Sequence, residues 1–288
     1  MNGTSHQTAA VVVLYHPLPE MMDNLRTFAQ QVDMIFVVDN SLPPARDFAA
    51  WLVAFRNVIY LPQGGNQGVA RALNIGAEQA MKAGCDFLLT MDQDSQAAPD
   101  MVARLMACLA LHGQEKVGMI APFHVTKAAG PSAGMAECED VMTPMTSGSL
   151  LNLSVFQKVG PFREELFIDF VDNEYCLRLR RQGFKVLRAN RALLCHSVGD
   201  TRKYGPFIAT NHPPLRRYYK TRNRFLVNRL YRRDFPGHCL FDRVRLTKEI
   251  VSIILFEREK VAKLRMMWRG YLDYRHGCFG KYGGGSQP

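Results

Sequence analysis

The first 125 residues alternate between two kinds of hydrophobic pattern. Short continuous apolar runs, such as Ala9–Leu14 and Met34–Val38, are typical of strands that are buried on both faces of a sheet. Between these runs, apolar residues recur every three or four positions, as they do on one face of a helix. Strands that alternate with helices over short connections predict an α/β fold with a doubly wound, mostly parallel sheet.

Similar patterns continue toward the C-terminus. Further strands are predicted at 57–61, 86–91, 117–121, 150–153, 184–187 and 192–195. Helices are predicted at 20–32, 70–80, 99–112, 154–159 and 172–182. Residues 127–143 have little periodicity and are predicted to form a flexible loop. We therefore predict one domain over residues 1–210, a basic helical extension over 211–282 and a flexible Gly-rich tail over 283–288.

Charge is distributed unevenly between the two halves of the chain. Residues 1–150 contain 8 Lys and Arg against 14 Asp and Glu, a net charge of −6, whereas residues 151–288 contain 28 against 12, a net charge of +16. The cations of the second half therefore predict an anionic partner, which can be a membrane surface, a phosphorylated substrate or a nucleic acid.

Cysteine usage and the apolar runs bear on the location of the protein. Seven cysteines are scattered without a Cys-x-x-Cys pair, which predicts reduced thiols and neither a disulfide framework nor a zinc site. Met1–Thr8 is polar and lacks the apolar core of a signal peptide. The longest aliphatic run, Ile250–Phe256, is too short to span a bilayer. These features predict a cytoplasmic chain that is soluble or peripheral to a membrane.

Several polar residues directly follow predicted strands. Asp39 follows the second strand, the glycine segment Gly64–Gly68 the third, and Asp92 and Asp94 the fourth. In a doubly wound sheet, ligands bind beyond the carboxyl ends of the strands. The convergence of these residues predicts a ligand site at that edge.

The pair Asp92 and Asp94 is the clearest chemical signal. Alternate residues of a strand lie on the same face about 7 Å apart, where two carboxylates repel by about 2–3 kcal/mol at an effective dielectric constant near 20. Mg²⁺ or Mn²⁺ would relieve the repulsion, since these hard cations prefer carboxylate and phosphate oxygens. The alternative interpretation is a solvated turn without a metal.

Five motifs in order resemble the inverting, GT-A-fold glycosyltransferases of family two over roughly residues 9–230. The motifs are residues 11–13, 38–41, 66–74, 92–94 and 167–175. The amino-acid sequences of Met91–Ser95 and Phe167–Asp169 are similar to those of bacterial rhamnosyltransferases within the family. The resemblance implies a GT-A, Rossmann-like fold and a nucleotide-sugar donor. The dinucleotide fingerprint Gly-x-Gly-x-x-Gly is absent from the sequence.

The resemblance also implies roles for residues at the donor site. Asp39 would accept hydrogen bonds from the pyrimidine, or else would only cap the following turn. Arg71 would pair with the diphosphate, because a guanidinium group matches phosphate geometry. Asn66 and Asn74 would orient donor groups, although Asn66 could equally serve only the turn. The implied donor-binding residues are Asp39, Asn66, Arg71, Asn74, Asp92 and Asp94.

A divalent cation, Mg²⁺ or Mn²⁺, belongs to the same implied site. Asp94 would bind the metal directly, and Asp92 would contact the ribose or the metal shell. His196 follows the acidic helix where many family members have a third metal ligand; the alternative is a structural histidine at a strand end. The metal would neutralise the departing diphosphate.

Inverting transfer requires a carboxylate that takes the proton from the acceptor hydroxyl. Asp172 matches the position of that base in the family, and its alternative role is to cap the helix that it begins. Most members have an acidic residue just before it, whereas this chain has Val171. Asp169, Glu174 and Gly148 are secondary candidates for site residues.

The C-terminal helices are rich in cations and aromatic residues. In the segment Pro213–Leu226, arginines and lysine alternate with tyrosine, phenylalanine and leucine. Basic helices of this kind suit the surface of an anionic membrane, and hence a lipid-linked acceptor. The alternative is that these helices complete the core and their cations are merely solvated.

The favoured function is transfer of L-rhamnose from dTDP-β-L-rhamnose to a hydroxyl of a lipid-linked or lipopolysaccharide glycan. That function predicts a peripheral protein on the inner face of the bacterial cytoplasmic membrane. The nearest alternative keeps the fold and transfers galactose, galactofuranose or N-acetylglucosamine from a UDP donor. A nucleic-acid-binding protein is a different class of alternative, disfavoured because the first half is acidic, and a catalytically silent partner of a glycan-assembly complex is another. The sequence predicts no oligomeric state.

Overall fold

The computed structural model divides the chain into two compact units. It describes residues 6–19, 21–125, 130, 132, 134–196, 202–205 and 207–283. Unit 1 comprises Met1–Arg163 and Tyr175–Ser197, and unit 2 comprises Glu164–Glu174 and Val198–Pro288. The predicted boundary at residue 210 therefore differs from this division, because the segment Glu164–Glu174 packs with the C-terminal helices. The predicted tail lies outside the described residues, except for Gly283.

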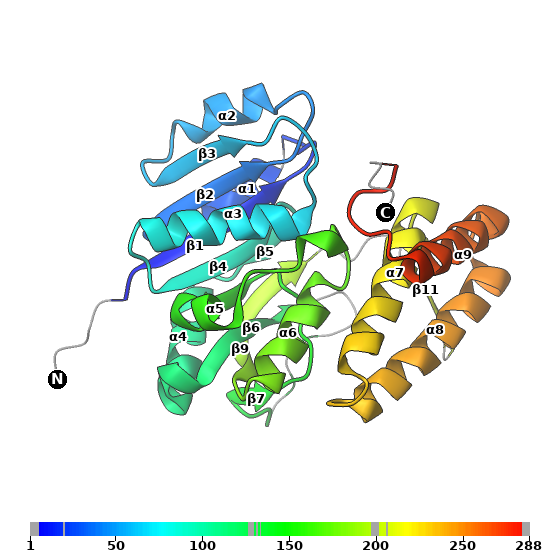
Figure 1. Cartoon of the computed structure of the whole chain (residues 1–288). Coiled ribbons are helices and arrows are strands. Elements are labelled where there is room, and N and C mark those ends of the chain that lie inside the picture. Colours follow the sequence, from blue (N-terminus) through cyan, green and yellow to red (C-terminus); the bar gives the residue numbers. More distant parts are fainter. Residues whose placement is uncertain are drawn as a thin grey trace. The chain divides into compact units, whose positions relative to one another are not determined.

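Unit 1 is built on a sheet whose first strands are parallel (Figure 1). The strands are β1 (Thr8–Leu14), β2 (Met34–Asp39), β3 (Val58–Pro62) and β4 (Phe87–Asp92). They lie in the order β3-β2-β1-β4. In this register Leu14 pairs with Asp39 and Val13 with Asp92, so the two aspartates flank the carboxyl end of β1. The ends of these four strands agree with the predicted ends to within about two residues.

The rest of the sheet is mixed and not mostly parallel. It contains β5 (Ser95–Ala97), β6 (Val117–Val125), β7 (Cys138–Asp140), β8 (Ser149–Asn152) and β9 (Lys185–His196). The order continues β4-β8-β6-β9-β5, with β7 also on β9. Among the described strands of this part, only β6 and β9 pair in parallel; β8, β5 and β7 run antiparallel to their neighbours. The two short strands predicted at 184–187 and 192–195 are one strand of 12 residues.

Helices cover both faces of this sheet (Figure 1). They are α1 (Met21–Ala29), α2 (Arg46–Leu52), α3 (Val69–Lys82), α4 (Met101–His112), η1 (Gln114–Lys116) and α5 (Leu153–Val159). Apolar residues of α1, α2 and α4 form one core with alternate residues of β1, β2 and β4. On the opposite face α3 approaches β1 so closely that a Cβ on Gly76 would lie 2.3 Å from Val11 Cγ2.

Unit 2 is mainly helical. Its elements are η2 (Glu164–Leu166), β10 (Arg202–Tyr204), β11 (Phe207–Ala209), α7 (Pro214–Tyr231), α8 (Pro236–Phe256) and α9 (Lys260–His276). The helix α6 (Val171–Arg181) begins in this unit and continues into unit 1. Gly270 lets α9 pack directly on α7, since a Cβ there would lie 2.5 Å from the Tyr218 carbonyl oxygen. In the described part of the chain, no helix is both long and apolar enough to cross a bilayer.

Candidate active site

Asp39 is fully buried at the carboxyl end of β2. Its carboxylate accepts hydrogen bonds from the backbone N–H groups of Ser41 and Ala45, each at 2.8 Å, and from the Tyr60 hydroxyl. Burial alone would raise the pKa of Asp39, but these hydrogen bonds outweigh it and hold the pKa below its usual value. Asp39 therefore stays ionised and fixes the loop after β2, as the capping alternative requires; a contact with a pyrimidine stays a prediction.

The glycine segment is tied to the end of β2 by Asn40. The Asn40 side chain donates to the Gly68 carbonyl oxygen at 3.1 Å and accepts from the Gln67 N–H at 3.4 Å. Asn66 accepts a hydrogen bond from the Gly68 N–H at 2.9 Å, which closes the turn before α3. Arg71 is half-buried in the first turn of that helix. The arrangement presents backbone and a guanidinium group at the helix start, where an anion is stabilised.

Asp92 and Asp94 do not alternate along one strand. β4 ends at Asp92, Gln93 and Asp94 form a turn, and β5 begins at Ser95. This corrects the predicted geometry, and the cause is a contact with a distant part of the chain: the Gln93 side chain bonds to both the N–H and the carbonyl oxygen of Tyr15, at 2.8 and 3.2 Å. Asp92 is exposed and Asp94 half-buried. Both carboxylates remain at the same edge of the sheet.

A serine that the motif analysis did not single out holds this turn. Ser147 Oγ accepts from the Asp92 N–H at 3.1 Å and lies 2.8 Å from Ser95 Oγ, and the Ser147 carbonyl oxygen lies 2.9 Å from His124 Nε2. The run of small polar residues before β8 was the available signal. Gly148, a secondary candidate, has a positive φ of 76°, and a Cβ there would lie 2.6 Å from Pro122 Cγ. Its place in the structure is therefore a close packing position.

His196 is the last residue of β9, and its backbone pairs with Ser95. The backbone register therefore sets it one residue away from Asp94 along the neighbouring strand. Its side chain lies outside the described residues, so its role as a metal ligand stays a prediction.

Asn74 is buried within unit 1 and faces the loop after α5. Its side chain donates to the Phe162 carbonyl oxygen at 2.9 Å and accepts from the Phe162 N–H at 2.8 Å. The two bonds use both the NH₂ group and the oxygen of the side-chain amide, and only 1% of the residue is exposed. Asn74 thus holds the loop after α5, and its predicted contact with the donor stays a prediction.

The three acidic residues around the start of α6 have different surroundings in unit 2. Asp172 is half-buried in the first turn, and its Oδ1 accepts from the Asn173 N–H at 2.8 Å. Glu174 is fully buried and accepts from the Tyr231 hydroxyl at 2.7 Å. Asp169 is paired with Arg216 at 3.2 Å, and burial raises its pKa despite that neighbour. The role of Asp172 as the base stays a prediction.

The segment before α6 is held in an unusual backbone conformation by α7. Phe167, Asp169 and Phe170 all have φ values between 62° and 65°, a region that costs L-residues about 1–3 kcal/mol each. The buried Asn223 side chain donates to the carbonyl oxygens of residues 166, 168 and 169 at 2.8–2.9 Å. Arg222 Nη2 adds bonds to those of residues 165 and 166 at 3.2 Å.

The predicted solvated or membrane-facing cations of α7 are largely buried. Arg217, Arg222 and Arg224 are at most 5% exposed. Arg217 pairs with Glu249 and Glu257, and Arg224 with Glu249 and Asp242. The correction has a simple cause: each buried guanidinium group is matched by acidic residues of α8 or by carbonyl oxygens. The exposed cations of the unit lie mostly on α8, on α9 and at the end of α7.

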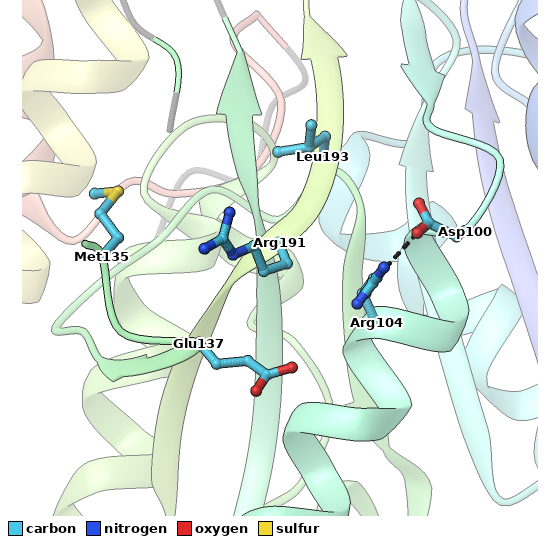
Figure 2. Close-up of a pocket in the computed structure, with 6 residues that line it drawn as sticks. All are labelled: Asp100, Arg104, Met135, Glu137, Arg191 and Leu193. Carbon is cyan, nitrogen blue, oxygen red and sulfur yellow. Dashed lines mark hydrogen bonds and ion pairs between the residues drawn. The ribbon is translucent and has the colours of Figure 1, made fainter. Parts of the chain in front are cut away.

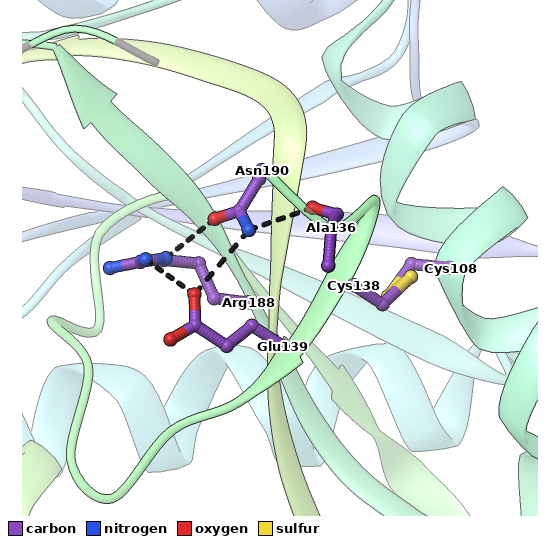
Figure 3. The surroundings of a disulfide bond; sticks show 6 residues. All are labelled: Cys108, Ala136, Cys138, Glu139, Arg188 and Asn190. Atoms are coloured by element: carbon purple, nitrogen blue, oxygen red, sulfur yellow. Dashed lines mark hydrogen bonds and ion pairs between the residues drawn. A yellow bond between two sulfur atoms is a disulfide. The ribbon is translucent and has the colours of Figure 1, made fainter. Parts of the chain in front are cut away.

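The expectation of uniformly reduced thiols is wrong for one pair. Cys108 of α4 and Cys138 of β7 form a disulfide (Figure 3), while the five other cysteines are not in disulfide bonds. Beside it Glu139 accepts from Arg188 at 2.7 Å (Figure 3). His112 lies one turn along α4 from Cys108, and its ring nitrogen and the two sulfurs lie within 4.8 Å of one another.

One cavity of unit 1 is lined by none of the predicted site residues. It measures about 480 Å³ and lies between α4, β9 and the segment before β7 (Figure 2). Its lining residues are Asp100, Arg104, Met135, Glu137, Arg191 and Leu193. The candidate site for the donor is instead the open edge formed by the ends of β2 and β4 and the start of α3.

Comparison with known proteins defines the class of this molecule. A sequence model described as Glycosyl transferase family 2 matches residues 12–125, which include Asp39, Arg71, Asp92 and Asp94. This stretch is therefore similar to a family 2 glycosyltransferase domain, and the protein is a glycosyltransferase. It is similar to the dTDP-rhamnosyl transferase RfbF of Shigella flexneri, with 28% identity over 303 aligned residues that cover 96% of this chain and 97% of the relative.

Solved structures confirm the GT-A fold. TarS of S. aureus (residues 1–349) has a TM-score of 0.54 and 14% identity, covering 94% of this chain and 72% of its own. GalNAc-T7, solved with UDP, GalNAc and Mn²⁺, has a TM-score of 0.57 and 14% identity over 68% of this chain. This chain spans 44% of the GalNAc-T7 chain. At these identities the likeness concerns the fold alone.

Proposed function

We propose that the protein is an inverting, metal-dependent rhamnosyltransferase that uses dTDP-β-L-rhamnose. The observation that carries the choice of sugar is the similarity to a dTDP-rhamnosyl transferase along nearly the whole length of both chains. The match includes the helical unit, and so it is not limited to the nucleotide-binding part of the fold. The acceptor is a hydroxyl of a lipid-linked or lipopolysaccharide glycan.

The donor is proposed to bind at the carboxyl edge of the sheet in unit 1. Asp39 and Asp92 flank the end of β1 in neighbouring strands, which puts their backbones about 10 Å apart. The nucleoside would lie along this edge, and Arg71 would pair with its diphosphate. Asn40 and Asn66 would keep the glycine turn in the shape that admits the phosphates.

The residues at the end of β4 fit a divalent cation of the Mg²⁺ or Mn²⁺ type. Asp92 and Asp94 offer hard oxygen donors on a turn fixed by Gln93 and Ser147, and neither carboxylate is buried. Those two residues would hold the ion, with His196 as a proposed third ligand. When bound, the ion would neutralise charge on the departing diphosphate.

Asp172 is proposed as the general base. Its half-buried carboxylate would take the proton from the acceptor hydroxyl as that oxygen attacks the anomeric carbon from the face opposite the diphosphate. Glu174 and Asp169 are engaged by Tyr231 and Arg216, which supports Asp172 over the two fallback residues.

The charge of the second half of the chain supports the proposed acceptor and location. Exposed cations and exposed apolar residues on α8 and α9 support association with an anionic membrane surface. We therefore propose a cytoplasmic protein, peripheral on the inner face of the bacterial cytoplasmic membrane, with no nucleic-acid partner.

Thermal shift with nucleotide sugars in the presence of Mn²⁺ or Mg²⁺ tests the choice of donor. A ligand at a hundred times its dissociation constant stabilises the protein by about 2.7 kcal/mol, so dTDP and dTDP-rhamnose should raise the Tm markedly. UDP, UDP-galactose and UDP-N-acetylglucosamine should give smaller shifts. A larger shift with a UDP compound would overturn the rhamnose assignment and keep the glycosyltransferase class.

A further inference from the structure

A cationic cavity lies within unit 2, and none of the residues proposed to bind the donor lines it. It measures about 300 Å³ and is formed by α7, α8 and α9. Four of its lining residues are arginines, and the others are Phe225, Asn228, Leu246 and Tyr274; the arginines are Arg224, Arg229, Arg232 and Arg243. Such a density of guanidinium groups suits a phosphate-bearing ligand.

Most of this positive charge is not neutralised by the protein. Arg224 is buried and paired with Asp242 and Glu249. Arg229, Arg232 and Arg243 are exposed, and within the described residues they form no ion pair with a carboxylate. Arg229 instead lies over the Tyr274 ring at 5.3 Å. Three uncompensated cations around one cavity favour an anion with more than one charge.

An apolar cavity shares a wall with the cationic one. It measures about 550 Å³, a size typical of ligand sites. Phe225 and Leu246 line both cavities. The remaining lining residues of the apolar cavity are Thr221, Ile250, Leu264, Met267, Trp268 and Tyr271. The combined surface is therefore cationic on one side of Phe225 and apolar on the other.

We propose that these joined cavities bind a lipid diphosphate, with its diphosphate among Arg229, Arg232 and Arg243 and its hydrocarbon chain against Trp268, Leu264 and Ile250. A diphosphate matches three cations better than the single charge of a phosphodiester headgroup. The proposal deepens the proposed function by naming the anchor of its acceptor, and it rests on that function only for the glycan that the anchor carries.

The protein carries its own reporter of the chain-binding side. Its two tryptophans are Trp51, in α2, and Trp268, in the apolar cavity. In a Trp51→Phe variant, fluorescence therefore reports Trp268 alone. Farnesyl diphosphate below its micelle concentration is expected to shift that emission to the blue and to bind at least tenfold more tightly than farnesol or inorganic diphosphate. Equal affinity for farnesyl diphosphate and farnesol would overturn the proposal.

Matched variants distinguish binding at the arginine-lined cavity from nonspecific electrostatic attraction to the protein surface. In the Trp51→Phe background, Arg232→Gln together with Arg243→Gln should weaken farnesyl diphosphate binding at least tenfold. Arg233→Gln removes an exposed neighbour that does not line the cavity and should change it less than twofold. Equal losses in the two variants would contradict the site, as would tighter binding of lysophosphatidylglycerol, which would identify a phospholipid surface instead. Circular dichroism confirms folding of each variant.

The binding assay contains neither nucleotide sugar nor metal, so its result is independent of the donor assignment. If dTDP-rhamnose fails to stabilise the protein while farnesyl diphosphate binds as expected, the proposed function fails and the lipid site stands. The reverse result removes the lipid site and leaves the transferase proposal intact.

Discussion

At the scale of single residues, the two carboxylates at the end of β4 have different surroundings. Asp92 is the last residue of the strand and is exposed, and its N–H donates a hydrogen bond to Ser147 Oγ. Asp94 is half-buried in the turn, next to the strand that pairs with β9. The more enclosed carboxylate is the better candidate for direct metal binding, because it is less accessible to competing water.

Replacing Asp94 by asparagine tests that assignment. Asp94→Asn removes the charge with little change in shape, so kcat should fall about 10²–10³-fold while the Tm stays within a few degrees. Steady-state kinetics over a range of Mn²⁺ concentrations measure the loss. Asp100→Asn, which removes an exposed carboxylate paired with Arg104, serves as the control and should retain activity. Wild-type kinetics in Asp94→Asn would remove it from the metal site.

The base assignment is also a prediction about one residue. Asp172→Asn should lower kcat about 10²–10⁴-fold, because the acceptor hydroxyl loses its proton acceptor. Binding of dTDP-rhamnose, measured by calorimetry, should persist. Unchanged turnover would exclude Asp172 as the base. Glu174→Gln is the comparison: it weakens a buried bond to Tyr231, so we expect a lower Tm without the loss of kcat.

At the scale of elements, α7 supports the motif that contains Asp172. The Asn223 amide holds three carbonyl oxygens of a segment with three positive φ values. Asn223→Ala would leave those buried acceptors without their donor, so the free energy of unfolding should fall by about 2–3 kcal/mol. Urea denaturation measures this. Thr247→Ala, which removes a hydroxyl on the exposed side of α8, should change stability by less than about 0.5 kcal/mol.

The ion pairs between α7 and α8 predict a specific acid response. Burial alone would raise the pKa of Glu249, but Lys220, Arg224 and Arg217 outweigh it and lower the pKa from 4.5 to about 2. A depressed carboxyl pKa contributes stability that is present above pH 4.5 and is lost as the pH falls toward 2, about 3 kcal/mol in full. Glu249→Gln should therefore be less stable than the wild type at pH 7, and the difference should shrink as the pH falls from 4.5 to 2. Denaturation at several pH values measures it; a constant difference would contradict the assignment.

Local patterns predicted the elements of unit 1 better than the contacts of unit 2. Continuous apolar runs are a sufficient signal for β1, β2 and β4, since burial on both faces leaves few alternatives. The turn at Asp94 depends on Gln93 reaching Tyr15, which lies 78 residues away and has no local signature. Likewise, the buried state of Arg217 depends on Glu249 of α8 and on Glu257, which directly follows that helix. Motif position made Asp39 and Asn74 candidates for donor binding, which stays a prediction; their hydrogen bonds show that both hold the scaffold.

At the scale of the whole molecule, the cysteines provide a check on the fold. The sequence favoured seven reduced thiols, whereas the structure joins Cys108 to Cys138 across 30 residues. Thiol titration of the denatured protein without reductant should therefore give five reactive groups, and seven after reduction. Seven groups before reduction would show that the pair is not oxidised. Cys195→Ser, at an exposed free thiol, should lower both counts by one.

The segment Glu164–Glu174 belongs to the unit of the C-terminal helices although it is separated from them in sequence. Hybrid enzymes that exchange the helical unit between relatives must therefore transplant this stretch along with residues 198–288. A hybrid joined only at residue 210 would combine one parent's Asp172 segment with another parent's helices. The design of such hybrids should exchange segments that pack together in the fold, and not all residues on one side of a single junction.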